Sequence, residues 1–279
     1  MFKILIFLLS WIVSWANPNS SNICKDNPTV VHEKFYNGYH IMISSAGNQA
    51  CHLLDIEKQG RRLLHDQEIG GHFYFGSNWQ NRVKPFSHVT GKEEDSLLIS
   101  KWTGGAHCCF SLEIFNVSRQ FKKIATINGG NFYPVLKDIN KDGIPEVELI
   151  DDFLAGVFSS FAQSAKGNVI LKYSRGTYSV AMEYMRKNAP SLNSMNHQIK
   201  LWQKELRSHK SPEWPPPSLV QAVTDLFFSG NEETALELVD RSWPSDVSGK
   251  ENFLKIYRDA LRGSLFYPEF ESQLSMVER

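Results

Sequence analysis

The residues with the clearest chemical meaning form one short acidic segment in the middle of the chain. Residues 138–146 read Asp-Ile-Asn-Lys-Asp-Gly-Ile-Pro-Glu, with a side-chain oxygen at nearly every second position. Calcium is a hard cation that takes about six to eight oxygen ligands from carboxylates, amides and backbone carbonyls. The segment therefore predicts a Ca²⁺ site. Its expected ligands are the side chains of Asp138, Asn140, Asp142 and Glu146 and the backbone carbonyl of Ile144.

The surroundings of this segment indicate what kind of calcium loop it is. Gly143 stands where such a loop must turn sharply, and glycine takes the required conformation without steric cost. An EF-hand would carry Glu at its twelfth position, where this chain has Leu149, and would lie between two helices. The flanking residues 132–136 and 147–150 are rich in β-branched and aromatic types, which predicts strands. We expect a strand-loop-strand site; the alternative is an acidic β-turn held by local Asn and Asp hydrogen bonds.

Four cysteines indicate an oxidising compartment, and an even number allows complete pairing. One arrangement joins Cys24 to Cys51 and the adjacent Cys108 and Cys109 to each other; the other joins each early cysteine to one of the adjacent pair. A bridge between neighbours requires a distorted backbone, because adjacent residues of a strand point to opposite faces. Long-range bridges also restrict the unfolded chain more, which favours the crossed arrangement.

Two further groups of residues invite a catalytic interpretation. His107 lies beside Cys108 and Cys109, which suggests a base next to a thiol nucleophile, but secreted thiols usually pair as disulfides, which favours a structural turn. Asp151 and Asp152 are adjacent carboxylates of the kind used in acid–base catalysis, and a capping or metal-supporting role is the favoured interpretation. An extracytoplasmic enzyme, a hydrolase using Asp151 and Asp152 or a thiol enzyme using His107 and Cys108, is the alternative function.

The first sixteen residues have the layout of a secretory signal peptide. Lys3 precedes an apolar run over residues 4–13, and Ser14-Trp15-Ala16 has the form of a cleavage site. The run is too short to cross a hydrocarbon layer of roughly 30 Å, and no later segment is apolar enough to do so. We expect residues 1–16 to be removed and the mature chain to be secreted or periplasmic, without a transmembrane segment.

The net charge of the chain indicates which kinds of molecule the protein binds. Thirty basic and thirty acidic residues give a formal net charge of zero. This balance argues against a nucleic-acid-binding protein and against a polybasic membrane-surface role. Because no residue set names a reaction, we expect a non-catalytic binding or envelope-associated protein whose partner is a protein or glycan of the cell envelope.

The elements that must position these residues change in kind along the chain. Alternating patterns predict strands at residues 39–43, 72–75, 97–102, 110–117, 121–127, 169–173 and 178–182, with Arg175-Gly176 as a hairpin turn. Helical periodicity predicts helices at residues 194–209, 218–228, 231–243, 250–261 and 268–276. We therefore expect an α+β protein, with a β-rich domain over residues 17–187 and an all-α region over residues 188–279.

The calcium segment has two weaker echoes. Residues 55–60, Asp-Ile-Glu-Lys-Gln-Gly, match residues 138–143 at four of six positions, and residues 88–93 match more loosely. Neither echo keeps the ligand set. Duplication of one antiparallel unit, as in a propeller or a sandwich, and ordinary hairpin turns explain the echoes equally well.

Residues 97–152 resemble the FG-GAP or VCBS type of secreted repeat protein, in which Asp-x-Asn-x-Asp-Gly loops bind calcium between the strands of a β-propeller. The loop at residues 138–146 matches that pattern. The Gly-Gly-Ala-His-Cys-Cys stretch is similar to uncharacterised bacterial secreted or periplasmic proteins. The resemblance implies a partial β-propeller-like or β-sandwich arrangement for the β-rich part, and it does not extend to the helical region.

Overall fold

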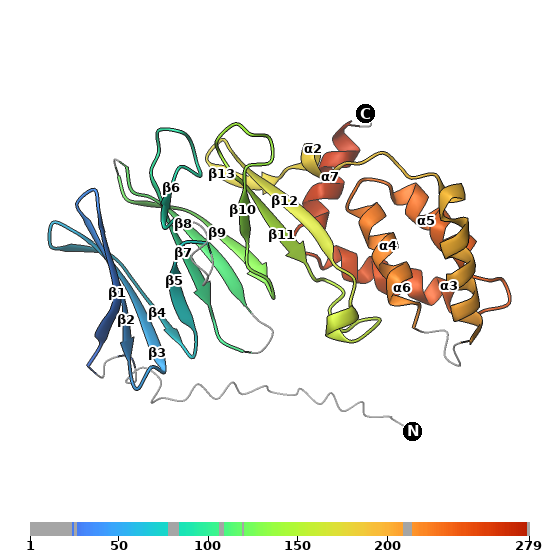
Figure 1. The fold of residues 1–279 in the computed structure, drawn as a ribbon, viewed down its shortest axis with the longest axis horizontal. Coiled ribbons are helices and arrows are strands. Elements are labelled where there is room, and N and C mark those ends of the chain that lie inside the picture. Colours follow the sequence, from blue (N-terminus) through green and yellow to red (C-terminus); the bar gives the residue numbers. More distant parts are fainter. Residues whose placement is uncertain are drawn as a thin grey trace, which may run out of the picture. The chain divides into compact units, whose positions relative to one another are not determined.

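The computed structural model describes residues 24, 27–77, 84–105, 109–118, 120–208 and 214–277. Strands fill the first part of this chain and helices the last part, so the predicted α+β class is confirmed (Figure 1). The contacts divide the chain into two compact units, Met1–Gly71 (unit 1) and His72–Arg279 (unit 2). The predicted signal peptide, residues 1–16, lies outside the described residues.

Unit 1 contains one antiparallel sheet, sheet A, whose four strands follow one another in chain order. Two of its hairpins have two-residue turns, Asn37-Gly38 and Gln59-Gly60, in which both residues have positive φ angles. Such turns match the twist of the strands that they join. The strands are β1 (Thr29–Tyr36), β2 (Tyr39–Ala46), β3 (Cys51–Lys58) and β4 (Arg61–Ile69).

Unit 2 begins with two further antiparallel sheets. Sheet B has the order β5-β7-β8-β9, with β6 also paired to β7, and sheet C has the order β10-β11-β12-β13. The predicted hairpin turn Arg175-Gly176 joins the last two strands of sheet C. The strands of sheet B are β5 (His72–Phe75), β6 (Phe86–Ser87), β7 (Ser96–Trp102), β8 (Phe110–Asn116) and β9 (Lys122–Gly130). Those of sheet C are β10 (Val135–Lys137), β11 (Glu146–Asp151), β12 (Gly167–Ser174) and β13 (Thr177–Val180).

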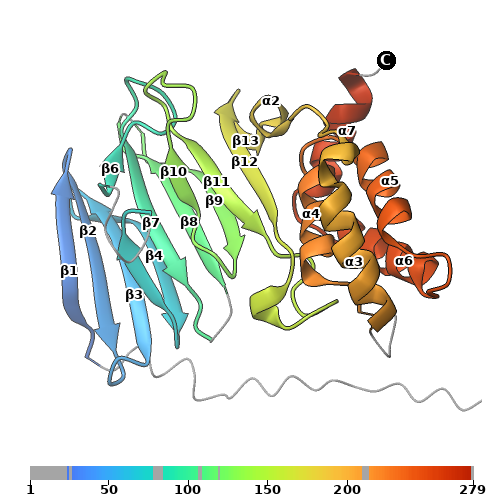
Figure 2. The ribbon, with the colours of Figure 1, turned by 45° about the vertical axis from the view of Figure 1, so that its right-hand side comes forward.

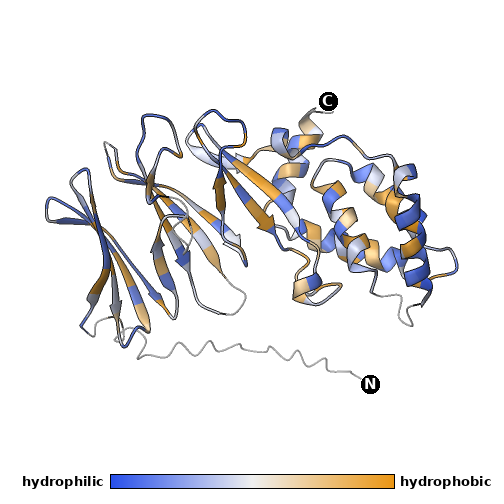
Figure 3. Ribbon diagram, in the orientation of Figure 1, coloured by the Kyte–Doolittle hydropathy of each residue, from blue (hydrophilic) through white to orange (hydrophobic). Residues whose placement is uncertain are grey.

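The helices follow sheet C, and the four longer ones between residues 196 and 262 are amphipathic, with apolar and polar residues on different sides (Figure 3). Their apolar faces are the ones expected from the 3.6-residue period: Ile199, Trp202 and Leu206 are buried on α3, for example. The α-helices are α2 (Met182–Met185), α3 (Asn196–Ser208), α4 (Pro217–Phe227), α5 (Glu232–Ser242), α6 (Lys250–Arg262) and α7 (Tyr267–Val277). Two 3₁₀ turns, η1 (Phe161–Gln163) and η2 (Leu192–Met195), precede them or lie between them.

The helices are part of unit 2, which differs from the predicted domain boundary at residues 187 and 188. One hydrophobic cluster contains Leu112 of sheet B, Val169 of sheet C and Leu238 of α5. Figure 2 shows α2 and α4 next to β12, in agreement with their contacts. The change in composition at residue 188 marks a change of secondary structure and not a change of unit, because the apolar faces of the helices are buried in a core that they share with the sheets.

Candidate calcium loop and the predicted site residues

The predicted calcium segment is the loop between the antiparallel strands β10 and β11. Val135 pairs with Glu148 and Lys137 pairs with Glu146, so the chain from Asp138 onward forms the connection. The strand-loop-strand prediction is therefore confirmed, and the two helices of an EF-hand are replaced by two strands of sheet C.

Short acidic and amide side chains fold inward onto the backbone of this loop. Asp138 accepts hydrogen bonds from the backbone N–H groups of Asp142 at 3.1 Å and Gly143 at 3.0 Å. Asn140 accepts from the Asp142 N–H at 2.9 Å, and Asp142 accepts from the Ile144 N–H at 2.7 Å. Each of these side chains thus satisfies a donor within five residues of itself, as Asp and Asn commonly do in turns.

Gly143 has the conformation that the sequence predicts for it. Its φ angle is +90°, and Lys141 two residues earlier has a φ of +62°. Two left-handed residues within three positions turn the backbone tightly around the side-chain oxygens. At Gly143 a side chain would be strained by the backbone angle and would also come within 3.4 Å of the Lys92 side chain.

Glu146, the last predicted ligand, differs from the other three side chains because it is buried, with 2% of its surface exposed. Its carboxylate accepts a hydrogen bond from the Ile139 N–H at 2.9 Å, and it forms no ion pair with any described residue. Burying a carboxylate is costly unless opposite charge or several hydrogen bonds compensate it. Glu146 therefore has oxygen lone pairs available on the inner side of the loop.

The fit of this loop to calcium is partial. Asp138, Asn140 and Asp142 are exposed and have oxygens of the kind that Ca²⁺ prefers. Within the described ranges, however, no group of three or more His, Cys, Asp and Glu side chains is gathered closely enough to hold a metal ion. The loop is closed in this structure by its own N–H donors, so a calcium ion would have to draw Asp138, Asp142 and Glu146 closer together.

Two lysines that the sequence did not single out act on the loop. The pKa of Asp142 is lowered mainly by the hydrogen bond from the Ile144 backbone, then by that from Asn140, with smaller contributions from the charges of Lys92 and Lys172. These lysines come from other parts of unit 2, fifty and thirty residues away along the chain, so no local pattern could reveal them. They supply part of the positive charge that an acidic loop requires.

Tyr184 of α2 also contacts the loop. Asn140 donates from Nδ2 to its hydroxyl oxygen at 2.8 Å, and Lys172 Nζ lies 3.4 Å from the same oxygen. The side-chain hydrogen bonds with Tyr184 and then Glu183 raise the pKa of Lys172. This connection ties the calcium segment to the end of sheet C and to the first helix.

The cysteines pair differently from the crossed arrangement that loop length favoured. Cys24 forms a disulfide with Cys51, with a Cα–Cα distance of 5.3 Å. The strand register explains this pairing: β1 runs beside β2, and Cys51 pairs with Ala46 of β2, so the start of β1 and the start of β3 lie at one end of sheet A. Cys109 is also disulfide-bonded and hence not a free thiol, whereas His107 and Cys108 lie outside the described residues.

Asp151 and Asp152, the other candidates for catalysis, have separate hydrogen-bond partners. Asp151 is 5% exposed and accepts hydrogen bonds from the Ser264 hydroxyl and from the Phe153 N–H. Asp152 accepts one from the Asn131 side chain. Burial is the main cause that raises the pKa of Asp151. Asp151 thus joins the end of β11 to the segment between α6 and α7.

The echo of the calcium loop at residues 55–60 has a different structure. Asp55 lies inside β3, where it contacts His65 at 2.8 Å and Arg62 at 3.2 Å across the hairpin. Only Gln59 and Gly60 form the turn. Glu57 and Gln59 occupy the positions of Asn140 and Asp142, and their longer side chains do not make the short local hydrogen bonds that shape the calcium segment.

Comparison of the chain with known protein-family models, with curated proteins and with solved structures finds no match to any of them. The resemblance to FG-GAP and VCBS repeats therefore stays a prediction. None of the described helices has the length and apolar character required to cross a membrane.

Proposed function

We propose that this protein is a secreted or periplasmic calcium-binding β-domain protein that acts in the cell envelope as a non-catalytic binding protein. The observation that carries the proposal is the loop from Asp138 to Glu146, in which three exposed Asp and Asn side chains turn inward and a buried Glu closes the loop. Calcium would supply positive charge that Lys92 and Lys172 supply only in part.

Two further features support the proposal. A disulfide between Cys24 and Cys51 is typical of proteins from oxidising compartments. Sheets A and C each consist of four strands in chain order, the order within a propeller blade, which supports the resemblance to calcium-binding propeller repeats. A glycan or a protein of the envelope is the kind of partner that such domains bind.

The role of calcium follows from the position of the loop between two paired strands. An ion that binds the folded loop, and not the unfolded chain, stabilises the fold through mass action. We expect the melting temperature of the mature protein to rise by about 5–10 °C between excess chelator and a calcium concentration about one hundred times the dissociation constant. Scanning calorimetry with EGTA, with Ca²⁺ and with Mg²⁺ measures this difference.

Variants make the test specific to the loop. Asp138→Asn and Glu146→Gln should each abolish most of the calcium-dependent rise, because each removes a carboxylate ligand. Glu148→Gln is the matched control: it removes the same charge two residues further along β11, where Glu148 pairs with Lys137 at 2.8 Å. It should keep the full rise. If saturating calcium leaves the melting temperature of the unmodified protein unchanged, the calcium proposal is wrong.

A further inference from the structure

A cleft of about 350 Å³ opens among the helices of unit 2, well apart in sequence from the calcium segment. Its apolar part is formed by Phe227 at the end of α4, Leu261 of α6 and the ring of Tyr267 at the start of α7. The volume lies at the lower end of the range of about 300–1,000 Å³ in which small ligands bind to proteins.

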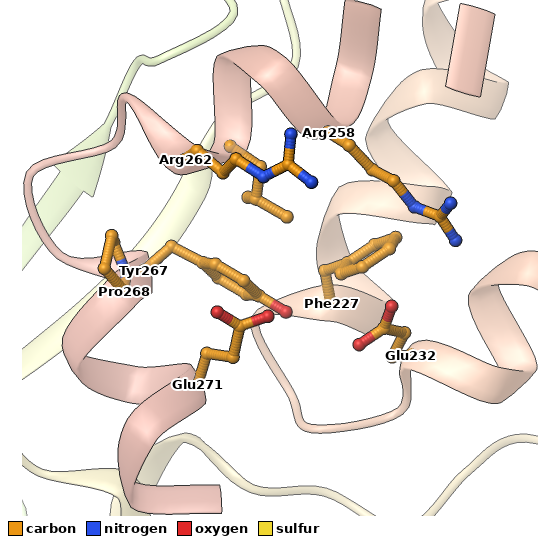
Figure 4. Close-up of a pocket in the computed structure, with 8 residues that line it drawn as sticks. Phe227, Glu232, Arg258, Arg262, Tyr267, Pro268 and Glu271 are labelled. Atoms are coloured by element: carbon orange, nitrogen blue, oxygen red, sulfur yellow. The ribbon is translucent and has the colours of Figure 1, made fainter. Parts of the chain in front are cut away.

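Charged side chains of opposite sign face each other across this cleft. Arg258 and Arg262 lie one turn apart on α6 and form one side, while Glu232 of α5 and Glu271 of α7 form the other (Figure 4). Arg262 pairs with Asp259 on its own helix at 3.0 Å. No ion pair with any described residue is formed by Arg258, Glu232 or Glu271. The two sides of the cleft therefore keep charges that a bound molecule can pair.

Tyr267 adds a neutral hydrogen-bonding group to the cleft. Its ring is buried, with 3% of the residue surface exposed, and it lines the cleft. Figure 4 shows the hydroxyl pointing into the cleft beside Glu271. A tyrosine of this kind offers an apolar ring and a polar tip to a ligand. Burial, followed by the charges of Glu232 and Glu271, raises the pKa of Tyr267, so the phenol keeps its proton and can donate a hydrogen bond.

We propose that this cleft binds a short zwitterionic peptide or free amino acid. Its carboxylate lies against Arg258 and Arg262, its ammonium group lies between Glu232 and Glu271, and its apolar side chain packs on the ring of Phe227. Guanidinium groups hold carboxylates through paired hydrogen bonds. A ligand with only a negative charge would face two unpaired glutamates, and one with only a positive charge would face two arginines, so a molecule with both charges fits best.

Blocked dipeptides test this proposal directly. The mature protein is titrated calorimetrically with L-leucyl-L-phenylalanine, with its N-acetyl derivative and with its C-terminal amide. We expect saturable binding of the free dipeptide at or below about 1 mM, and binding about ten-fold weaker or worse for each blocked form, since each has lost one charged contact. Equal binding of the three forms, or no saturable binding of the free dipeptide, would overturn the proposal.

Variants assign each end of the ligand to its side of the cleft. Arg258→Gln should weaken the free dipeptide about ten-fold and leave the C-terminal amide almost unchanged, because the amide already lacks the carboxylate. Glu271→Gln should weaken the free dipeptide and spare the N-acetyl form. Lys255→Gln is the matched control on the exposed side of α6. An equal loss in Lys255→Gln and Arg258→Gln would show a general charge effect and contradict the site.

This cleft and the calcium loop are tested by different measurements. Variants of exposed cleft residues should leave the calcium-dependent melting shift intact, and chelator should leave dipeptide affinity intact. The failure of one proposal is thus distinguishable from the failure of the other.

Discussion

Both compact units of this chain bury apolar side chains, among them Ile41 and Leu54 in unit 1, and they differ in the interactions that accompany this burial. In unit 1 a disulfide joins Cys24 to Cys51 beside a small buried cluster, and ion pairs such as Arg62 with Asp55 lie on partly exposed strands. In unit 2 one hydrophobic cluster contains residues of sheets B and C and of the helices.

One glycine from each unit shows how the surroundings of the backbone differ. Gly60 of unit 1 has a φ of +74°, and a Cβ placed on it would meet no described atom within 4 Å. Glycine is therefore favoured at this position by the backbone angle of the turn and not by lack of space. Gly167 of unit 2 lies where a Cβ would come within 2.5 Å of the Phe228 ring, so glycine is required here because there is no room for a side chain. Loss of the disulfide should therefore destabilise unit 1, and an added methyl group at Gly167 should destabilise unit 2.

Removal of the disulfide should have the largest effect. Cys24 and Cys51 are separated by 27 residues along the chain, a loop whose closure restricts the unfolded state by about 3.5 kcal/mol in the chain-entropy model. The double variant Cys24→Ala/Cys51→Ala should lose stability of that order. Hydrogen exchange followed by mass spectrometry should show the loss of amide protection in β2 and β3.

The pattern of protection decides whether the contrast between the units is correct. We expect β11 and β12 of unit 2 to keep their protection in the double variant, because their stability comes from the shared hydrophobic cluster. An equal loss in both units would mean that they unfold as one, and the proposed difference between them would fail.

A small increase in volume inside unit 2 should have the next largest effect. Gly167→Ala forces the added methyl group against the Phe228 ring, which is itself 4% exposed and packed near Phe153 and Tyr267. We expect a loss of about 1–3 kcal/mol in urea unfolding, as for other overpacked cores.

Two comparisons check that volume is the cause. Gly60→Ala introduces the same methyl group at an open turn and should cost only about 1 kcal/mol, through backbone strain. Phe228→Leu combined with Gly167→Ala should be less destabilised than the sum of the single variants, because the smaller side chain makes room. Strict additivity would contradict a direct clash.

Secondary structure was predictable where one face of an element is buried and the other is not. The helices α3 to α6 follow apolar periods that match their buried faces, and the strand at His72–Phe75 was expected at its observed bounds. The strand Thr29–Tyr36 was missed because almost all of its residues are exposed, which removes the alternating signal. Its Asn37-Gly38 turn was the signal that could have revealed it.

The two candidate sites also differ in how far the sequence could predict them. The calcium segment is continuous in sequence, so its spacing revealed the side chains and the turn at Gly143, although not the contribution of Lys172. The helical cleft takes Phe227, Arg258 and Tyr267 from three helices, so no spacing brings them together. Asn231 shows a further limit: Asn directly before a helix is a common N-cap, but the Asn231 side chain bonds to Ser229 and Lys187 and does not cap α5.

The smallest expected effect is a pH dependence that arises in unit 2 from Asp151. Burial raises the pKa of this carboxyl above 3.8, even though the hydrogen bond from Ser264 opposes the shift. At pH values between 3.8 and the raised pKa, the folded state binds more protons than the unfolded state. The free energy of unfolding therefore falls as pH rises through this window, and above the window it falls no further on account of Asp151. One proton limits this slope to about 1.4 kcal/mol per pH unit.

Asp151→Asn removes this ionisation and keeps an oxygen that can accept the Ser264 hydroxyl hydrogen bond. We expect the stability of the variant relative to the unmodified protein to increase as pH rises through the window and then to stay constant, as measured by urea unfolding at a series of pH values. A difference that does not change with pH would show that Asp151 is as well solvated in the folded protein as in the unfolded chain. Its buried contact with Ser264 would then carry none of the cost of desolvation, and any pH dependence of unit 2 would have to arise from other groups.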